Sequence, residues 1–500
     1  MKFKRSSGIL LHPTSLPGPD GIGDLGPEAY KWVQFLADAG IGLWQILPLG
    51  PTGYGDSPYQ CFSAFAGNPL LVSPALLLDE GLLTHDDLKD RPQSNPRKID
   101  YGPAIQWKTK CLDRAYQHFH SHPSAAIKHD FDRFKETEKD WLNDYAAYRT
   151  IKDSQGGVAW IDWPEDLRLY QPEKVAAFIS DHTDEYERHL FYQFLFFKQW
   201  LPLKEFANQK NIRLIGDIPI FISQDSADAW SNRRLFKLDQ FGNPTVVAGV
   251  PPDYFSPTGQ LWGNPHYDWD VHKKEGYTWW AKRISSCLKT VDVIRLDHFR
   301  GFAASWEVKY GDPTAEKGHW RKGPAFDLFD ALQNQLGEVP IIAEDLGRIT
   351  EDVVALREKY NYPGMKILQF SFGTDASEPF LPHNYPENCV AYTGTHDNDT
   401  TISWYQTAPD HEKKYCGEYL RSDAKDIAWD LIRGVWSSVS VYSLACMQDF
   451  LRLDTTARMN YPGRPSGNWE WRMDHSDMSD ELAEQIYDLN RIYGRVANQK

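Results

Sequence analysis

The chain has 500 residues, and its 54 Lys plus Arg against 69 Asp plus Glu give a formal net charge of −15. Nucleic acids and anionic membranes attract cationic surfaces, so we expect neither among the partners of this acidic chain. The six cysteines form no CxxC pair, which gives no support to a zinc or thioredoxin-type site. Scattered thiols, and no apolar run of about 18 residues, predict a cytoplasmic protein.

Short apolar segments alternate with helical segments along most of the chain. The first predicted strand is followed by a helix over Pro27–Gly40, with proline near its start and glycine as its stop. The alternation yields eight strands, the number in a (β/α)8 TIM barrel of the α/β class. The predicted strands cover Gly8–His12, Leu43–Leu49, Ile212–Ile222, Val291–Phe299, Val339–Leu346, Lys366–Phe372, Cys389–Thr393 and Leu444–Phe450.

Two stretches interrupt this alternation of predicted strands and helices. Residues 71–165 are charged and mainly helical in pattern, whereas residues 223–277 are rich in Pro, Gly, Asn, Asp and aromatic residues. No Gly/Ser-rich or Pro-rich connector borders either stretch, so we interpret both as insertions between barrel strands rather than as linked domains. The barrel itself is then expected over residues 1–70, 166–222 and 278–500.

A GxGxxG match at Gly21–Gly26 does not predict a dinucleotide site. That site needs a strand ending at the first glycine and an acidic residue about 20 positions later. Here nine residues, three of them proline, separate Leu11 from Gly21, and residues 41–48 contain no acid. We interpret the segment as a loop with turn glycines.

Charged side chains lie at the end of the fourth predicted strand. In the segment Ile294–Arg300, apolar residues lead to Asp297, and Arg295 lies two residues earlier on the same face. An arginine beside a carboxylate favours the ionised form, which a nucleophile requires. A purely structural Arg–Asp pair is the alternative.

The fifth predicted strand ends in two acids, in the segment Ile341–Gly347. A carboxyl group at the mouth of an apolar strand can be kept protonated by desolvation, which suits a general acid. We assign that role to Glu344 and expect Asp345 to cap the following turn.

A polar loop, Tyr392–Thr400, follows the seventh predicted strand and contains His396 and Asp397. These two could instead bind a metal, although a metal site would need further ligands nearby. Asp297, Glu344 and Asp397 are about 50 residues apart, the spacing of successive βα units, so we expect all three at the rim where barrel active sites are built.

Two weaker signals accompany these acids. Asp217 ends another predicted strand, in Ile215–Pro219. The loop Gly53–Gln60 exposes Ser57 and Tyr59 after the second strand, although loops rich in glycine and proline usually only turn the chain.

With these residues, the chain resembles the 4-α-glucanotransferases known as amylomaltases or disproportionating enzymes, a branch of the α-amylase superfamily. The resemblance covers nearly the whole chain, from Gly8–Pro17 to Asn468–Arg472. The charged pairs at the three strand ends are features of the superfamily. Two segments, Gly249–Ser256 and Gly259–Pro265, are more specific to the amylomaltase branch.

The resemblance implies a retaining double displacement on maltooligosaccharides and α-1,4-glucans. It implies Asp297 as the nucleophile, Glu344 as the general acid and then base, and Asp397, with His396, as the stabiliser of the transition state. The residues agree in chemical type, because an ionised carboxylate and a raised-pKa acid would flank a glycosidic bond. Retention itself depends on the resemblance, since sequence gives no carboxyl separation.

The resemblance also implies a set of substrate-binding residues and an insertion, 223–277, that covers the substrate. Trp262 is expected on an exposed loop of this insertion, and a core tryptophan is the alternative. The expected substrate-binding residues are Ser57, Tyr59, Asp217, Asp253, Trp262, Asn264, Arg295, His298, His396 and Asn468.

Two other functions remain open. An α-1,4-glucan hydrolase would use the same three acids and would differ only in that water resolves the intermediate. A non-catalytic glucan-binding barrel is disfavoured, because it would tend to have lost one of the acids. Only the segments within 249–265 and the resemblance favour transfer. We expect no metal and no cofactor.

Overall fold

Eight parallel strands form a barrel in the computed structural model, which describes residues 3–252 and 256–497. The sheet order is β10-β11-β12-β1-β2-β3-β6-β9. The N–H of Ala343, at the end of β9, donates to the carbonyl oxygen of Pro363 beside β10, so the two edges of the sheet meet. The structure confirms the predicted (β/α)8 barrel. Its strands are β1 (Ser6–Leu10), β2 (Leu43–Gln45), β3 (Arg213–Ile218), β6 (Val293–Leu296), β9 (Ile341–Ala343), β10 (Gly364–Ile367), β11 (Cys389–Tyr392) and β12 (Tyr442–Cys446).

Each of the eight strands ends earlier than predicted. Apolar residues that follow the strands are buried but lie outside the paired strands. Short helices begin directly after two strands, at Leu368–Phe370 after β10 and at Met447–Phe450, named α17, after β12. Hydrophobicity alone does not separate a strand from the buried turn that follows it.

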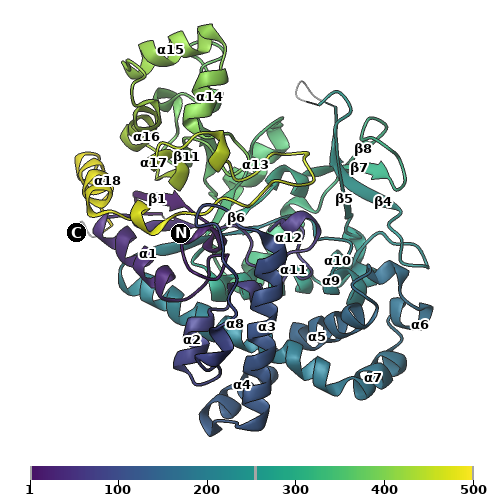
Figure 1. Ribbon diagram of the computed structural model, residues 1–500. Helices are drawn as coiled ribbons and strands as arrows, with labels where there is room; N and C mark the ends of the chain where they lie inside the picture. The colour runs from purple at the N-terminus through teal and green to yellow at the C-terminus, as the bar shows by residue number, and fades with distance from the viewer. Residues whose placement is uncertain (1–2, 253–255, 498–500) are drawn as a thin grey trace.

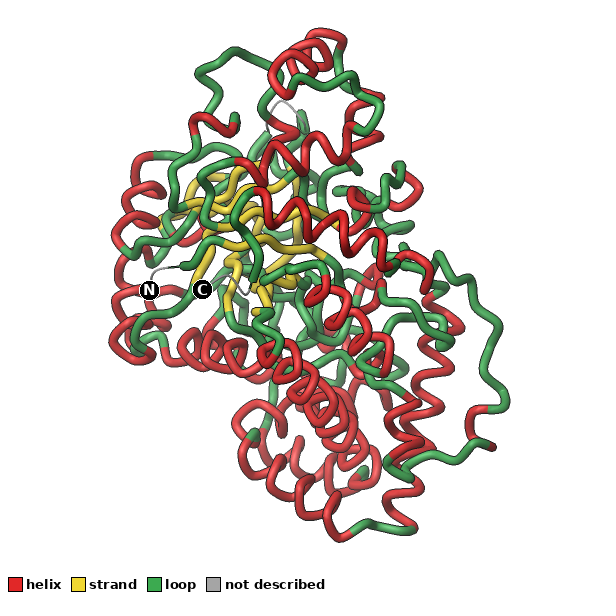
Figure 2. Tube along the Cα trace, turned by 90° about the vertical axis from the view of Figure 1, so that its left-hand side faces the viewer, coloured by secondary structure: helices red, strands yellow, loops and turns green. Residues whose placement is uncertain are grey.

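Helices surround the barrel, and Figure 2 shows the strands gathered inside a layer of helices. The barrel encloses a core of its own, with Leu43, Ile215 and Val293 among the buried side chains. A larger apolar cluster lies between the strands and the helices. The main barrel helices are α1 (Pro27–Asp38), α8 (Thr183–Gln209), α11 (Thr278–Thr290), α12 (Ala325–Leu336), α13 (Glu351–Lys359), α16 (Ile427–Ser437) and α18 (Asp480–Ile492).

Between β2 and β3 the chain forms further helices, which project from one side of the barrel (Figure 1). The longest is α3, whose buried side chains recur on one face. None of the described helices is both long and apolar enough to cross a membrane. These helices are α2 (Pro74–Asp79), α3 (Tyr101–Ser121), α4 (Ala125–Thr137), α5 (Lys139–Ser154), α6 (Glu165–Arg168) and α7 (Pro172–Asp181).

A second, antiparallel sheet has the order β5-β4-β7-β8 and lies beside the barrel (Figure 1). The prediction of a loop around Trp262 is wrong, because this residue lies in β5. Its neighbours Gln260, Leu261 and Gly263 are exposed and Trp262 itself is half-buried, so it is not a core tryptophan. Non-local pairing of β4 with both β5 and β7 makes these strands, and a local pattern of Gly, Pro and Asn does not show it. The strands are β4 (Val246–Val250), β5 (Gln260–Pro265), β7 (Ala304–Lys309) and β8 (His319–Lys322).

Short helices complete the connections between strands. Two of them, α14 and α15, lie together at one end of the molecule (Figure 1). The remaining α-helices are α9 (Ala227–Ser231), α10 (Trp269–Lys274), α14 (Thr401–Thr407) and α15 (Asp410–Leu420).

Candidate active site

Arg295 joins two carboxylates at the carboxyl end of the barrel. It lies on β6 opposite Asp217 of β3, so the pairing of the strands sets the two side chains against each other. One guanidinium nitrogen, Nη1, is 2.6 Å from Asp217 Oδ2 and 2.9 Å from Asp297 Oδ1. Burial acts to lower the pKa of Arg295, but the weakly screened charges of Asp217 and Asp297 outweigh it and hold this pKa well above its ordinary value.

Asp297 and Glu344 follow the last paired residues of β6 and β9. Leu296 is paired with Ala343, so the next residues on the two strands, Asp297 and Glu344, are neighbours. The N–H of Glu344 continues the ladder to the carbonyl oxygen of Leu296 at 3.0 Å. Adjacent strands are about 4.8 Å apart, so the backbones that carry the two carboxyl groups are separated by about that distance.

Two backbone N–H groups hold the carboxyl group of Glu344. His298 N donates to Oε2 at 2.7 Å, and Leu346 N donates to Oε1 at 2.8 Å. His298 has a left-handed backbone, with φ of 50°, which a non-glycine residue adopts at some cost. Burial, together with the charge of Asp297, raises the pKa of Glu344 to about 7 despite the opposing charge of Arg295.

Asp397 is held from two directions. His396 Nε2 is 3.4 Å from Asp397 Oδ2, and Asn460 Nδ2 donates to Oδ1 at 2.7 Å. Arg458 fixes the backbone by donating to the carbonyl oxygen of Asp397 at 2.7 Å. About half of the Asp397 side chain is exposed at the open rim. Desolvation by the surrounding protein acts to raise the pKa of Asp397, but the charge of His396 and the bonds from His396 and Asn460 outweigh it and lower the pKa well below its usual range.

Tyr59 connects the Asp217 side of the site to the His396 side. Its hydroxyl donates to Asp217 Oδ2 at 2.8 Å, and its ring stacks on that of His396 with centroids 5.0 Å apart. Ser57 Oγ accepts the N–H of Tyr59 at 3.2 Å, which orders the loop locally. The contact of Ser57 with substrate stays a prediction. The same ring lies 6.0 Å from Trp469.

Trp262 packs against the catalytic strand ends from the second sheet. Its ring meets the imidazole of His298 edge-on, with centroids 4.9 Å apart, and its side chain is half-buried. Desolvation lowers the pKa of His298 to about 4, so this imidazole is neutral at pH 7. Asn264, on the same strand, is buried and donates to the carbonyl oxygen of Ile222 at 2.7 Å.

The other expected residues differ in position. Asn468 uses both ends of its amide within its own loop, accepting from Tyr461 N at 2.8 Å and donating to the carbonyl oxygen of Arg464 at 2.9 Å. Its contact with substrate stays a prediction. Asp253 lies outside the described residues.

The role assigned to Asp345 is wrong. Its Oδ1 accepts the N–H of Met365 at the start of β10, 2.7 Å away, and its Oδ2 lies 3.1 Å from Arg357. The carboxylate therefore joins β9 to β10 and α13 instead of capping the turn that follows it.

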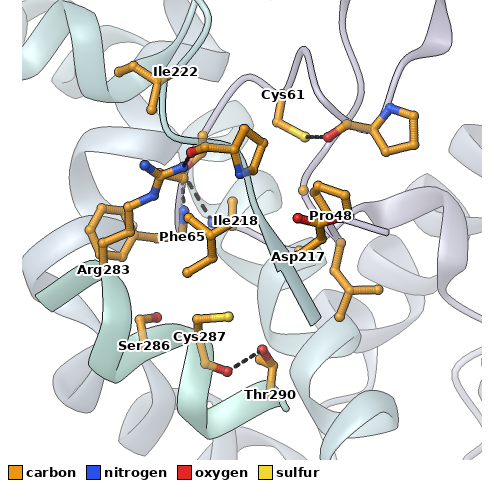
Figure 3. Close-up of a pocket in the computed structure, with 18 of the residues that line it drawn as sticks. Pro48, Cys61, Phe65, Asp217, Ile218, Ile222, Arg283, Ser286, Cys287 and Thr290 are labelled. Atoms are coloured by element: carbon orange, nitrogen blue, oxygen red, sulfur yellow. Dashed lines mark hydrogen bonds between the residues drawn. The ribbon is translucent and has the colours of Figure 1, made fainter. Parts of the chain in front are cut away.

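A cavity of about 90 Å³ lies beside Asp217 (Figure 3). Asp217, Cys61, Arg283 and Cys287 are among its lining residues. Asp217 Oδ1 is buried and has no hydrogen-bond partner, whereas Oδ2 carries both bonds described above. The cavity is lined by both apolar and polar groups and has room for water, which would satisfy Oδ1.

Asn460, Arg458 and Trp469 contact the site, yet we assigned no role to them from the sequence. The polar run Arg458–Tyr461 was the available signal, but nothing local indicates that it reaches Asp397. No group of three His, Cys, Asp or Glu side chains within residues 3–252 and 256–497 is arranged to hold a metal ion. Whether activity needs a metal stays a prediction.

Comparison with known proteins identifies the family of the chain. The family model described as 4-alpha-glucanotransferase matches residues 11–477. The chain belongs to the 4-alpha-glucanotransferase family. A 4-alpha-glucanotransferase of Thermus thermophilus is 47% identical over 489 residues, covering 96% of this chain and 97% of that protein. The 4-alpha-glucanotransferase of Clostridium butyricum is also 47% identical over 489 residues, covering 97% of this chain and all of that protein.

The fold of this glucanotransferase agrees with that of a solved relative. The amylomaltase from Streptococcus agalactiae, solved in complex with acarbose, is 39% identical, with a TM-score of 0.96 over 99% of this chain and 100% of that chain. This agreement extends to the second sheet and the helical insertion, since it spans nearly the whole of both chains. The transferase interpretation is thereby favoured over the hydrolase alternative.

Proposed function

We propose that the enzyme moves α-1,4-linked glucan segments between maltooligosaccharides by a retaining double displacement at Asp297. The observation that carries this proposal is the position of Asp297, held by Arg295, beside the half-buried Glu344 on the neighbouring strand. Asp297 and Glu344 start from adjacent strands about 4.8 Å apart, and the proposal predicts that their carboxyl groups lie about 5–5.5 Å apart, as in retaining enzymes. Membership of the family supports the reaction class.

In the first step, Asp297 attacks the anomeric carbon and the glycosidic carbon–oxygen bond breaks. Glu344 gives its proton to the leaving oxygen, and a shortened glucan departs. Arg295 favours the ionised form of Asp297 that this attack requires. The raised pKa of Glu344 keeps a proton available near neutral pH, which is where a general acid is most effective.

In the second step, an acceptor hydroxyl gives its proton to Glu344 while its oxygen attacks the anomeric carbon and releases Asp297. Asp297 carries no negative charge while it is esterified. One of the causes that raise the pKa of Glu344 is then absent, so the ionised form of Glu344 becomes easier to reach. The same carboxyl group therefore serves as acid first and base second.

Asp397 stabilises the positive charge that develops on the sugar ring between these two states. His396 and Asn460 keep its carboxylate ionised and fix its direction. Preorganised charge of this kind costs no rearrangement when the reaction occurs. Tyr59, stacked on His396, completes the wall of the donor-sugar site.

Transfer requires that a sugar hydroxyl reaches the intermediate before water does. Trp262 belongs to the second sheet and packs edge-on against His298. In this position it would reduce the access of water to the intermediate. A bound acceptor also gains from being held in attacking geometry, where its effective concentration can exceed that of free molecules by many orders of magnitude.

Incubation with maltotriose tests this function. Transfer conserves the number of glycosidic bonds, so reducing ends should stay nearly constant while glucose and longer oligosaccharides appear together. Reducing ends that rise with the consumption of maltotriose would show a hydrolase. The cytoplasmic location and the absence of nucleic-acid partners stay predictions from the sequence.

A further inference from the structure

A second, larger pocket adjoins the cavity beside Asp217, with Ser63, Phe65 and Ser286 in the lining of both. Its volume is about 410 Å³, and it lies where α5 of the helical insertion meets α9, α11 and the end of α12. Asp297, Glu344 and Asp397 are not among its lining residues. The volume is within the range of about 300–1,000 Å³ that small-molecule sites occupy.

Three aromatic rings form the apolar part of this pocket. Phe65 and Trp141 are close to parallel, with centroids 6.5 Å apart and an angle of 12°. Trp279 meets Phe65 edge-on at 6.0 Å. Trp141 is half-buried, and its indole N–H is already used on Glu138 at 2.8 Å, so its contribution to a ligand is its ring surface.

Carboxylates and hydroxyls form the polar part. Asp228 is buried, and its Oδ2 accepts the N–H of Ala64 at 2.7 Å. Asp144 accepts the hydroxyl of Tyr170 at 2.6 Å. Ser231 and Ser285 add hydroxyl groups from α9 and α11. Each carboxylate can accept further hydrogen bonds, so the pocket favours a ligand that donates hydroxyl protons.

The charges of the pocket disfavour an anion. Each of the two lysines in its lining is paired with an acid of the lining, Lys282 with Asp140 and Lys289 with Glu138, both at 2.7 Å. With these pairs neutralised, the carboxylates of Asp144 and Asp228 remain. A neutral ring with an apolar face and several hydroxyl groups fits aromatic surface beside hydrogen-bond acceptors.

We propose that this pocket binds a glucose unit of an α-glucan, at a non-catalytic site separate from Asp297, Glu344 and Asp397. The choice of glucose depends on the proposed function. The existence of a sugar site depends only on the rings, hydroxyls and carboxylates of the pocket.

The test counts bound maltotriose per chain by calorimetry in the Glu344→Gln protein, which retains the catalytic site but turns over slowly. Ser285→Trp, added to this background, fills the pocket from α11. Trp141→Ala removes a ring surface. Ser63, Phe65 and Ser286 also line the cavity beside Asp217, so they are left unchanged. Ser180→Trp, on the exposed face of α7, is the matched control.

We expect Ser285→Trp and Trp141→Ala each to lose one bound maltotriose per chain, whereas Ser180→Trp loses none. Unchanged binding in Ser285→Trp would overturn the proposal even if Trp141→Ala fails to fold. Turnover of maltotriose by protein with Glu344 intact separates the two claims. If wild type and Ser285→Trp both lack transfer but differ by one bound sugar, the proposed function fails and the second site stands.

Discussion

The side-chain amide of Asn460 donates a 2.7 Å hydrogen bond to Asp397 Oδ1, although the two residues are 63 positions apart in the chain. The loop after β12 thus reaches back over the rim of the barrel to hold an acid that follows β11. Because Nδ2 donates to a carboxylate, the bond is charge-assisted and stronger than one between neutral groups.

Replacing Asn460 with alanine should lower kcat about 10- to 100-fold. A hydrogen bond to a charged group contributes about 1.5–3 kcal/mol, and part of that would be lost from the transition state. The pKa of Asp397 should rise, so the loss should be larger in acid than at neutral pH. Asn388→Ala, at an exposed amide bonded to Asn361, is the control. A pH profile that keeps its shape would contradict the positioning role.

Replacing Arg295 with methionine should reduce both stability and activity. Its removal leaves two carboxylates in a buried position without their cation, and breaking such a pair costs about 3–5 kcal/mol. Urea unfolding measures the stability, and Arg295→Lys separates loss of charge from loss of the contact with both acids. Wild-type stability in Arg295→Met would show that the pair contributes little.

The pH dependence of kcat/KM should reflect Glu344. Glu344 must be protonated in the first step and its pKa is about 7, so kcat/KM should fall as the pH rises through about 7. Glu344→Gln should abolish transfer and remove this limb from any residual activity. A descending limb that persists unchanged in Glu344→Gln would assign it to another group.

The same shift makes a prediction about stability. The folded protein holds this proton up to about pH 7, whereas the unfolded chain releases it near 4.5, so Glu344 destabilises the fold as the pH rises between these values. Glu344→Gln should therefore raise Tm more at pH 8 than at pH 4. An equal change in Tm at both pH values would show that Glu344 is not desolvated as described.

Replacing Trp262 with alanine should increase the share of hydrolysis. Its ring packs on His298 beside the catalytic acids, and its loss should admit water to the intermediate. The ratio of new reducing ends to transfer products from maltotriose measures this share. Trp320→Ala, on β8 of the same sheet, is the control. If Trp262→Ala loses activity but keeps its product ratio, Trp262 binds sugar and does not exclude water.

The barrel could be predicted from the sequence because each of its strands contains a local apolar run and each following helix shows a local helical periodicity. The acids at strand ends could be located for the same reason, since strand order places carboxyl ends at one rim. Strand ends were predicted too late, as at Leu368–Phe370, because a buried turn has the same composition as a strand.

Features that depend on distant pairing could not be predicted in this way. The strand containing Trp262 exists because β4 pairs with β5 and β7. The hydrogen bond from Asn460 to Asp397 likewise joins segments that are far apart in the chain. The hydrogen bond from Met365 N to Asp345 joins residues next to or within different strands. Only the assembled barrel brings these groups within hydrogen-bonding distance.

The central claim is that Asp297 forms a glycosyl ester, and trapping that ester tests it most directly. Glu344→Gln should react with α-maltotriosyl fluoride, because fluoride leaves without a proton from Glu344, whereas release of the ester needs Glu344 as base. Mass spectrometry of the acid-quenched, digested protein should then find one maltotriosyl group on the peptide that contains Asp297. Consumption of the fluoride with no adduct, or an adduct on a different carboxylate, would contradict the account.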